Sequence, residues 1–232
     1  MSVARTLPAY ALTAVAGWID TVGIVLFFEE LQIFPTYMSG NTTRLFVSAE
    51  QGDLRRLGLF GAVIVLFVIG AGVGRWINDG SRAREAKGLL LEATLIFSAA
   101  LTAASSAPET LTLGLLAAAM GWNNVALEPR HGVVPRGFIT GTLISLASAV
   151  ADALARRGPW SRVQKPTMVW LSLSGGALAG VYSTTLLSDI LVLLVPTMVV
   201  ALCGVAFAMG WVRDGATSGE PEFGTLHGSP GS

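Results

Sequence analysis

Long apolar stretches separated by short polar segments dominate the chain. Six of them have the length of about 20 residues that a helix needs to cross a bilayer: Leu7–Phe28, Leu57–Trp76, Gly88–Ser105, Leu111–Leu127, Met168–Leu187 and Asp189–Val212. Two further helical runs, Met38–Glu50 and Phe138–Leu154, are shorter or more polar. This pattern predicts an all-α integral membrane protein with six spanning helices and two short polar helices. Eight spans are the alternative.

One combination of small, aromatic and polar residues occurs twice. Residues 17–20 read Gly-Trp-Ile-Asp, and residues 121–124 read Gly-Trp-Asn-Asn. Residues 38–42 read Met-Ser-Gly-Asn-Thr, and residues 139–143 read Ile-Thr-Gly-Thr-Leu. The two copies keep the same order, and their internal spacing differs by three residues. Duplication of an apolar chain with polar residues at matching places is typical of transporters.

The duplication divides the chain into two membrane repeats, residues 1–106 and 107–212. Residues 213–232 are rich in Gly, Ser, Glu and Pro and are predicted to form a disordered cytoplasmic tail.

Basic residues separate the two topologies. If all eight helical runs cross, Lys and Arg divide almost evenly between the two sides. If each of the two short runs returns to the side it came from, one side of the membrane holds 12 of the 15 basic residues and the other holds only Arg44, Arg55 and Arg56. Positive-inside orientation then favours six spans, inverted repeats and both termini in the cytoplasm.

Composition agrees with a membrane protein and narrows the function. Apolar residues make up 52% of the chain and charged residues 13%, against about 25% charged residues in soluble domains; mean hydropathy is +0.62. Zero net charge argues against a nucleic-acid partner. Cys203 is the only cysteine, and neither His131 nor His227 is part of a sequence pattern of metal ligands. We expect no enzymatic activity, no cofactor and no metal.

Asp20 is the most conspicuous polar residue, because it lies deep in the first predicted span and shares one helix face with Thr13 and Gly17. A carboxylate near mid-membrane costs a few kcal/mol, so it normally faces a cavity or a partner. Asp20 is expected to carry a coupling proton or to contact a solute. The alternative is a structural role, in which it accepts hydrogen bonds from a neighbouring break in the helical backbone. We expect it to be buried against the segment Ser39–Arg44.

The two short helical runs each have a polar stripe. In the first, the spacing i, i+3, i+7, i+10 joins Asn41, Arg44, Ser48 and Gln51. The corresponding stripe of the second contains Thr142, Ser145 and Asp152. Such stripes inside a membrane bundle should line water or a solute path; the alternative is that the hydroxyls bond the preceding turn. Arg44 could pair with Asp20 or Asp152.

Pro35 and Pro135 each precede a Gly-containing polar cluster, which resembles a chain break followed by a capped helix start. Free N–H groups at two such starts, converging near the midplane, could hold a polar or anionic solute. The predicted solute site or pathway therefore consists of Asp20, Gly40, Asn41, Thr42, Arg44, Asn124, Thr140, Gly141, Thr142 and Asp152.

Two glycine pairs have the spacing of close helix packing, Gly70 with Gly74 and Gly176 with Gly180. They predict tight packing within the chain, and a homodimer through either glycine face is the alternative.

Taken together, the Gly-Trp-Ile-Asp and Met-Ser-Gly-Asn-Thr segments with their second copies resemble the YoaK-type bacterial inner-membrane proteins over about residues 8–212. Ser39 stands where that family is expected to have Thr, and Trp122-Asn123-Asn124 where it more often has Gln-Asn. The resemblance implies a multi-pass inner-membrane protein of unassigned biochemical function. With the duplication, it leads us to expect a transporter or channel for a small polar solute, an anion among the candidates. The alternative is a non-catalytic membrane scaffold or assembly protein.

Overall fold

The computed structural model describes residues 3–27, 33–127 and 139–212. Within these ranges the chain is all-helical, as predicted, and contains no strand. Its elements are α1 (Val3–Val22), a π-helical turn η1 (Gly23–Phe27), α2 (Met38–Glu50), α3 (Leu54–Ile77), α4 (Arg82–Ala103), α5 (Glu109–Asn123), α6 (Ile139–Leu154), α7 (Ser161–Leu186) and α8 (Asp189–Ala208). The predicted tail, 213–232, lies outside the described residues.

Four of these helical segments are long and apolar enough to cross a membrane: Arg5–Leu26, Leu54–Ile77, Arg82–Ala103 and Asp189–Ala208. The other two predicted spans also form helices, but α5 has only 15 residues, and α7 carries Arg162 and Lys165 near its start. The short run Met38–Glu50 forms a helix with the predicted bounds.

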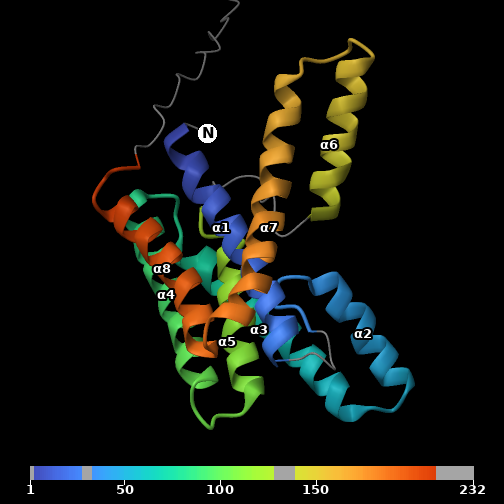
Figure 1. The fold of residues 1–232 in the computed structure, drawn as a ribbon, viewed down its shortest axis with the longest axis vertical. Coiled ribbons are helices and arrows are strands. Elements are labelled where there is room, and N and C mark those ends of the chain that lie inside the picture. The colour runs from blue at the N-terminus through green and yellow to red at the C-terminus, as the bar shows by residue number, and fades with distance from the viewer. Residues whose placement is uncertain (1–2, 28–32, 128–138, 213–232) are drawn as a thin grey trace, which may run out of the picture.

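The helices form a bundle with two peripheral hairpins. α4 packs against α8 and α5, α1 against α7 and α8, and α3 against α5. α2 contacts chiefly α3, and α6 contacts chiefly α7, so neither short helix belongs to the centre of the bundle. Figure 1 shows α2 at one end of the molecule and the α6–α7 hairpin extending toward the other.

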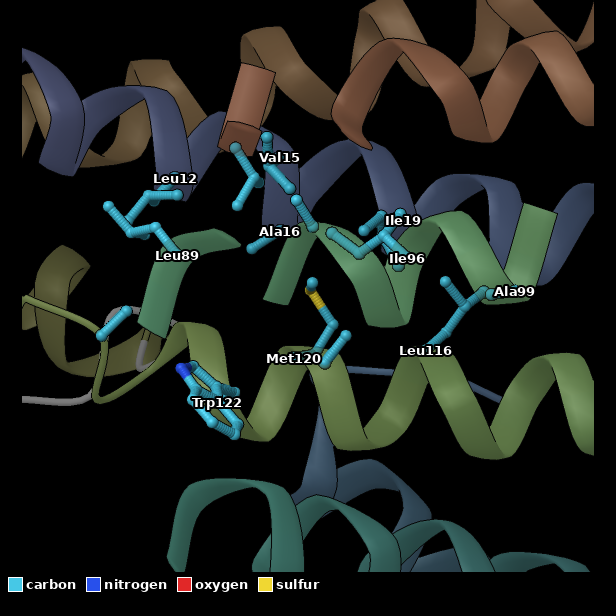
Figure 2. Close-up of a cluster of buried hydrophobic side chains, with 14 of the residues drawn as sticks. Leu12, Val15, Ala16, Ile19, Leu89, Ile96, Ala99, Leu116, Met120 and Trp122 are labelled. Carbon is cyan, nitrogen blue, oxygen red and sulfur yellow. The ribbon is translucent and has the colours of Figure 1, made fainter. Parts of the chain in front are cut away.

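The main hydrophobic core lies between α1, α4, α5 and α8. Leu12 and Ile19 of α1, Leu89 and Ile96 of α4, and Met120 of α5 are fully buried in it (Figure 2). A smaller core joins α3, α5 and Ile33. The apolar groups that remain exposed on the outer faces suit a lipid environment, since a membrane helix need not hide them from solvent.

Two glycines allow α1 and α7 to cross at close range. A Cβ atom added to Gly17 of α1 would collide with the carbonyl oxygen of Leu173, and one added to Gly176 of α7 would collide with that of Ala14. Only a residue without a side chain lets the two backbones come this near. The Gly17 of the repeated motif is therefore a packing residue.

The crossing of α5 and α3 is built in the same way. A Cβ atom on Gly121 of α5 would collide with the carbonyl oxygen of Phe67, and one on Gly70 of α3 would collide with that of Ala118.

The predicted glycine faces are thus used within the chain. Gly70, Gly74, Gly176 and Gly180 are all buried, covered by α5 in the first pair and by α1 in the second. A homodimer through these faces would have to displace a helix of the same chain, so the structure favours the intramolecular prediction.

Contacts at both ends of the bundle define the helix directions. Arg82 lies near Gly210 and Leu90 near Gly204, so α4 and α8 are antiparallel. In α1, the Arg5 guanidinium lies 5.9 Å from the Phe207 ring, near the end of α8. Trp18 Nε1 donates to the Val192 carbonyl, near its start, at 3.0 Å. Because α1 and α4 both run opposite to α8, they share one direction.

α5 is antiparallel to α4 as well. Thr102 and Thr112 share a hydrogen bond of 2.8 Å at one end, and Glu92 contacts Asn123 farther along. α5 and α8 therefore run in the same direction, opposite to α1 and α4.

Candidate functional site

Asp20 holds the chain segment that precedes α2. Its Oδ1 accepts a hydrogen bond of 2.7 Å from the backbone N–H of Thr36, and its Oδ2 accepts one from the Thr36 hydroxyl. The sequence predicted contact with Ser39–Arg44, which is wrong by a few residues: the partner lies two residues before α2 begins. Both oxygens of the Asp20 carboxyl group thus accept a hydrogen bond from the same residue.

Asn41 holds the same segment from the other side. This side chain is fully buried; its Nδ2 donates to the Phe34 carbonyl at 2.7 Å, and its Oδ1 accepts from the Phe34 N–H at 3.3 Å. An amide that both donates and accepts can replace the pairing of an irregular backbone segment. Asp20 and Asn41 together fix residues 33–37.

The predicted helix start at Gly40 and Asn41 is not what the structure contains. α2 begins at Met38, Tyr37 precedes it without a side-chain cap, and the Thr42 hydroxyl bonds back to the Met38 carbonyl at 2.8 Å. The amide of Asn41 is used on Phe34 instead of on the first turn. Gly40 makes room for the Tyr37 ring, with which an added Cβ would collide.

Arg44 is half-buried, and its guanidinium lies 5.7 Å from the centroid of the Phe34 ring. This is the range of a cation–π contact. Of the two partners expected from the sequence, Asp20 binds Thr36, and Asp152 belongs to α6, which packs on α7.

The second copy is less enclosed than the first. Asn124 is buried, and its Nδ2 bonds the Met120 carbonyl of its own helix at 2.8 Å. Thr140 is exposed, whereas Gly141, Thr142 and Asp152 are half-buried. Pro135, which marks the predicted second chain break, lies outside the described residues. Since α2 packs on α3 and α6 on α7, helix packing does not bring Asn41 and Thr142 into one central site.

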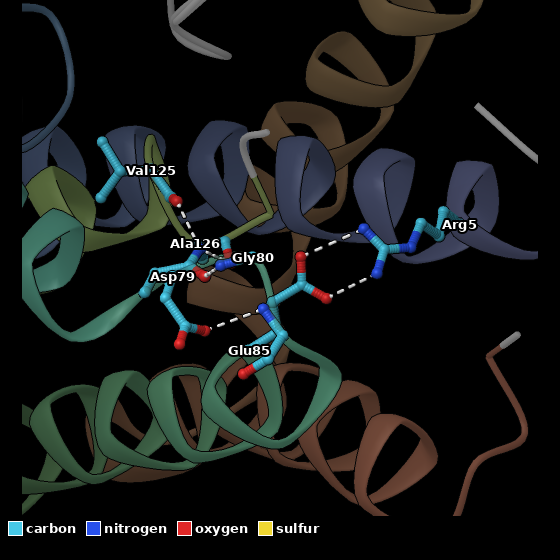
Figure 3. A network of polar contacts seen from close by, with 8 residues as sticks. Arg5, Asp79, Gly80, Glu85, Val125 and Ala126 are labelled. Carbon is cyan, nitrogen blue, oxygen red and sulfur yellow. Dashed lines mark hydrogen bonds and ion pairs between the residues drawn. The ribbon is translucent and has the colours of Figure 1, made fainter. Parts of the chain in front are cut away.

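A different set of polar side chains lies between the helices of the bundle, beginning with an ion pair between the starts of α1 and α4. Arg5 binds Glu85 through two guanidinium nitrogens, at 3.2 and 3.0 Å (Figure 3). Glu85 is only 1% exposed, and Arg5 also lies over the ring of Phe207. A bidentate pair of this kind is geometrically specific and fixes the start of α1 on α4.

Glu92 lies on the same face of α4, two turns or about 10 Å beyond Glu85. It is fully buried and accepts a hydrogen bond of 2.7 Å from Nδ2 of Asn123 at the end of α5, also fully buried. Sequence reasoning missed it, although one signal was present. Glu92 is the acidic residue inside the predicted span Gly88–Ser105.

Asn78 fixes the chain next to Asn123. This buried residue follows α3, and its Nδ2 donates to the carbonyls of Val125 at 3.1 Å and Ala126 at 2.8 Å. Its Oδ1 accepts from the N–H of Gly80 at 2.9 Å (Figure 3). The end of α5 is thereby held against the connection between α3 and α4.

A shallow open cavity of about 520 Å³ lies between the first turns of α4 and the end of α8. Its lining residues are Arg82, Ala83, Ala86, Phe207 and Ala208. Phe207 also contacts Arg5, so the cavity adjoins the Arg5–Glu85 pair. The candidate site thus follows α4, from the cavity past this ion pair to Glu92. In the part of the chain that the structure describes, no three His, Cys, Asp or Glu side chains come together as metal ligands.

Long apolar helices arranged in this way define a multi-pass α-helical membrane protein. Within that class, the chain belongs to a family described as a protein of unknown function (DUF1275), whose model matches residues 9–210. No curated protein and no solved structure matches the chain.

Proposed function

We propose that this protein is a transporter that moves a small polar solute across the membrane, along a path between two inverted repeats. The observation that carries the proposal is the Glu92–Asn123 pair, because it joins α4 of one repeat to α5 of the other at full burial. Buried polar pairs between membrane helices commonly mark substrate or ion pathways.

The two glycine crossings support an internal repeat. Residues of the α1–α7 crossing have counterparts in the α5–α3 crossing at a nearly constant distance along the chain. This distance is 104 residues from Ala14 to Ala118 and from Gly17 to Gly121, and 106 residues from Phe67 to Leu173 and from Gly70 to Gly176. In this proposal α1–α4 form one repeat and correspond to α5–α8 of the other. One helix of each repeat packs against the other repeat: α3 packs on α5, and α7 packs on α1.

Helix directions support six crossings over eight. If α2 and α3 both crossed the membrane, α4 would run opposite to α1, yet the two run in the same direction. If α6 and α7 both crossed, α8 would run opposite to α5, yet these two also share a direction. The longer helices of the two hairpins, α3 and α7, are the natural crossing members, and α2 and α6 return to the side they came from.

Charge gives the orientation of this arrangement. The start of α1, the end of α8 and the α6–α7 turn lie toward one end of the molecule (Figure 1). Nine basic residues belong to this end: Arg5, Arg75, Arg82, Arg84, Lys87, Arg156, Arg157, Arg162 and Lys165. The positive-inside rule makes it the cytoplasmic end and puts both termini there, in a bacterial inner membrane if the resemblance to YoaK-type proteins holds.

The carboxylates of α4 are not required by the repeated architecture. α8 takes the equivalent place in the second repeat, and after Asp189 at its first position it has no acidic residue. A buried carboxylate is costly in a membrane, and the same helix position can be filled without one. Glu85 and Glu92 are therefore best explained by function.

The cavity at the basic end suggests the type of solute. Arg82 lines it, and Arg5 lies next to it, so the positive potential there would attract anions and polar molecules with an anionic group. Beyond the ion pair, the Asn123 amide can donate to such a solute and accept from it. Asp20 and Asn41 have a supporting role in this proposal, because they bind Thr36 and Phe34 in the segment just before α2.

Counterflow in proteoliposomes tests the proposal. Vesicles loaded with one unlabelled solute class at a time, such as monocarboxylates, dicarboxylates, amino acids or inorganic anions, are diluted into traces of the labelled compound. We expect protein-dependent, saturable exchange for one class and its loss in Asn123→Leu. Thr112→Val is the matched control: it also removes a buried hydrogen bond of α5, but at the opposite end of the helix, and should retain exchange.

Thermal unfolding of both variants shows whether they are folded. Absence of exchange for every class with folded wild-type protein would contradict transport and favour the membrane scaffold. Equal exchange in wild type and Asn123→Leu would move the path away from the Glu92–Asn123 pair.

A further inference from the structure

We propose that α8 contains a hinge at Pro196, that the indole of Trp18 holds this hinge in its present position, and that bending there opens the cavity between α4 and α8. The role of the hinge in transport rests on the proposed function, but the hinge itself can be measured without any solute. The observations behind it are one hydrogen bond between α1 and α8 and a difference between the two tryptophans of the repeated motif.

Pro196 interrupts the backbone hydrogen bonds of α8. It lies inside this helix and has no N–H, so the Val192 carbonyl, four residues earlier, lacks the donor that an α-helix normally provides. Val192 is fully buried, and a buried carbonyl without a donor is costly. Trp18 of α1 supplies a donor, because its Nε1 donates to this carbonyl at 3.0 Å. A side chain of α1 therefore satisfies the backbone of α8 where the proline leaves it incomplete.

The second tryptophan of the repeated motif lies against a helix without a proline. Trp122 comes 104 residues after its counterpart in α1, and its Nε1 lies 3.4 Å from the position of a Cβ atom on Gly88 of α4. Gly88 precedes Val192 by the same 104 residues, so Glu92 takes the place of Pro196. Glu92 has a backbone N–H for the Gly88 carbonyl. Of these two corresponding helices, only α8 has the break at this position.

A bend at Pro196 acts on the cavity at the end of α8. Phe207 and Ala208 form one side of this cavity, opposite the first turns of α4. Phe207 is eleven residues beyond the proline, which is about 16 Å along a helix. Sharp proline kinks exceed about 20°, and a bend of that size moves the end of α8 by about 6 Å over this length. Such a displacement is comparable with the width of a small polar solute.

α1 contacts α8 on both sides of the hinge, but in different ways. Before Pro196, the Trp18 indole makes a directed hydrogen bond to the backbone. Beyond it, the Arg5 guanidinium lies 5.9 Å from the Phe207 ring, a cation–π contact that does not fix a single geometry. The open cavity next to Phe207 also leaves this end of α8 without full contact with α4. The part of α8 beyond the proline is therefore the part that moves.

The donor at the Val192 carbonyl should determine the position of this part. In Trp18→Phe the indole donor is lost, and the carbonyl then gains a partner when α8 bends and admits water, which commonly satisfies backbone groups freed by a proline in a membrane helix. Pro196→Ala has the opposite effect, because alanine supplies the backbone N–H and closes the helical hydrogen bond. Trp18→Phe is thus expected to open the hinge, and Pro196→Ala to remove it.

Pairs of spin labels on α4 and α8 measure the bend in the reconstituted protein without solute, in a Cys203→Ala background. One pair is placed at the end with the cavity, on Lys87 and Met209. The control pair is placed at the opposite end of the same two helices, on Leu101 and Leu191. All four side chains are exposed, so the labels do not disturb the packing between the helices. Electron paramagnetic resonance gives the distance within each pair.

The two pairs should respond differently. Trp18→Phe should lengthen the distance at the cavity end, and adding Pro196→Ala to this variant should return it to the wild-type value. The distance at the control end should stay the same in every variant. An unchanged distance at the cavity end of folded Trp18→Phe would overturn the hinge, and so would an equal change at both ends, which would mean that α8 moves as a rigid helix.

Thermal unfolding tests the indole as a substitute donor. Trp18→Phe should lower the melting temperature of the wild type by more than it lowers that of Pro196→Ala, since the latter has its own backbone donor. Trp211→Phe is the matched control: this tryptophan follows α8 and is 72% exposed, so its replacement should leave both melting temperatures unchanged. An equal loss from Trp18→Phe in both backgrounds would contradict the role of the indole.

Counterflow separates this inference from the proposed function. Folded Pro196→Ala should lose most of the exchange rate, because its α8 cannot bend to open the cavity. Exchange equal to wild type in this variant would overturn the role of the hinge in transport while leaving the transporter intact. If wild-type vesicles show no counterflow but the labels report the bend, the proposed function fails, the transport role of the hinge fails with it, and the hinge stands.

Discussion

At the scale of single residues, the repeated polar positions have structural partners that a sequence does not reveal. Asp20 and Asn41 are recognisable from the duplication, but the groups they bind, Thr36 and the backbone of Phe34, belong to an irregular segment. Such a segment follows no hydrophobic period, so its contacts could not be predicted. Glu92 was missed for the opposite reason, since the strongly apolar run around it hides one carboxylate.

Loss of the hydrogen bonds between Asp20 and Thr36 should destabilise the protein. Asp20→Asn replaces one acceptor oxygen by an N–H₂ group, which must then face a donor of Thr36, and we expect a loss of about 1–3 kcal/mol in the free energy of unfolding. Thr36→Val should have a similar effect. Thr43→Val is the control, because this exposed hydroxyl bonds only the preceding turn. Thermal or denaturant unfolding in detergent measures the effect. Unchanged stability in Asp20→Asn would contradict a stabilising role for the Asp20–Thr36 hydrogen bonds.

At the scale of elements, sequence patterns predicted the helices better than their pairing. The apolar runs gave the approximate bounds of the helices, and small residues at a spacing of four marked the faces of α3 and α7 that pack. The partners, α5 for α3 and α1 for α7, could not be predicted from the sequence, because each lies far away along the chain and only the folded backbone brings the two helices together.

The glycine crossings predict a sharp difference between neighbouring positions. Gly176→Ala should destabilise the protein by about 1–3 kcal/mol or more, because its Cβ would collide with a backbone carbonyl of α1 that cannot easily move. Gly175→Ala is the control, since an added Cβ there meets no atom within 4 Å. Gly70→Ala and Gly72→Ala form the matching pair in α3. The melting temperatures of the four variants measure the difference. Equal values within a pair would contradict the close crossing of α7 with α1 or of α3 with α5.

At the scale of the whole molecule, the class of protein followed from composition and from the length of the apolar runs, and the structure agrees with it. The centre of the molecule was predicted less well. Sequence reasoning assigned the solute site to the starts of α2 and α6, but these helices pack on α3 and α7 at the periphery. The buried polar pair lies instead on α4 and α5, where Asn123 donates to Glu92.

The transporter proposal depends on two inverted halves with six crossings, and side-specific cysteine labelling tests this arrangement most directly. Single cysteines at Ala107, between α4 and α5, and at Gly158, between α6 and α7, are introduced in a Cys203→Ala background. A membrane-impermeant maleimide is then applied to intact cells and to inverted vesicles. Six crossings predict that position 158 reacts from the cytoplasmic side and position 107 from the opposite side. Reaction of both positions from the same side would mean eight crossings and would contradict the inverted repeat.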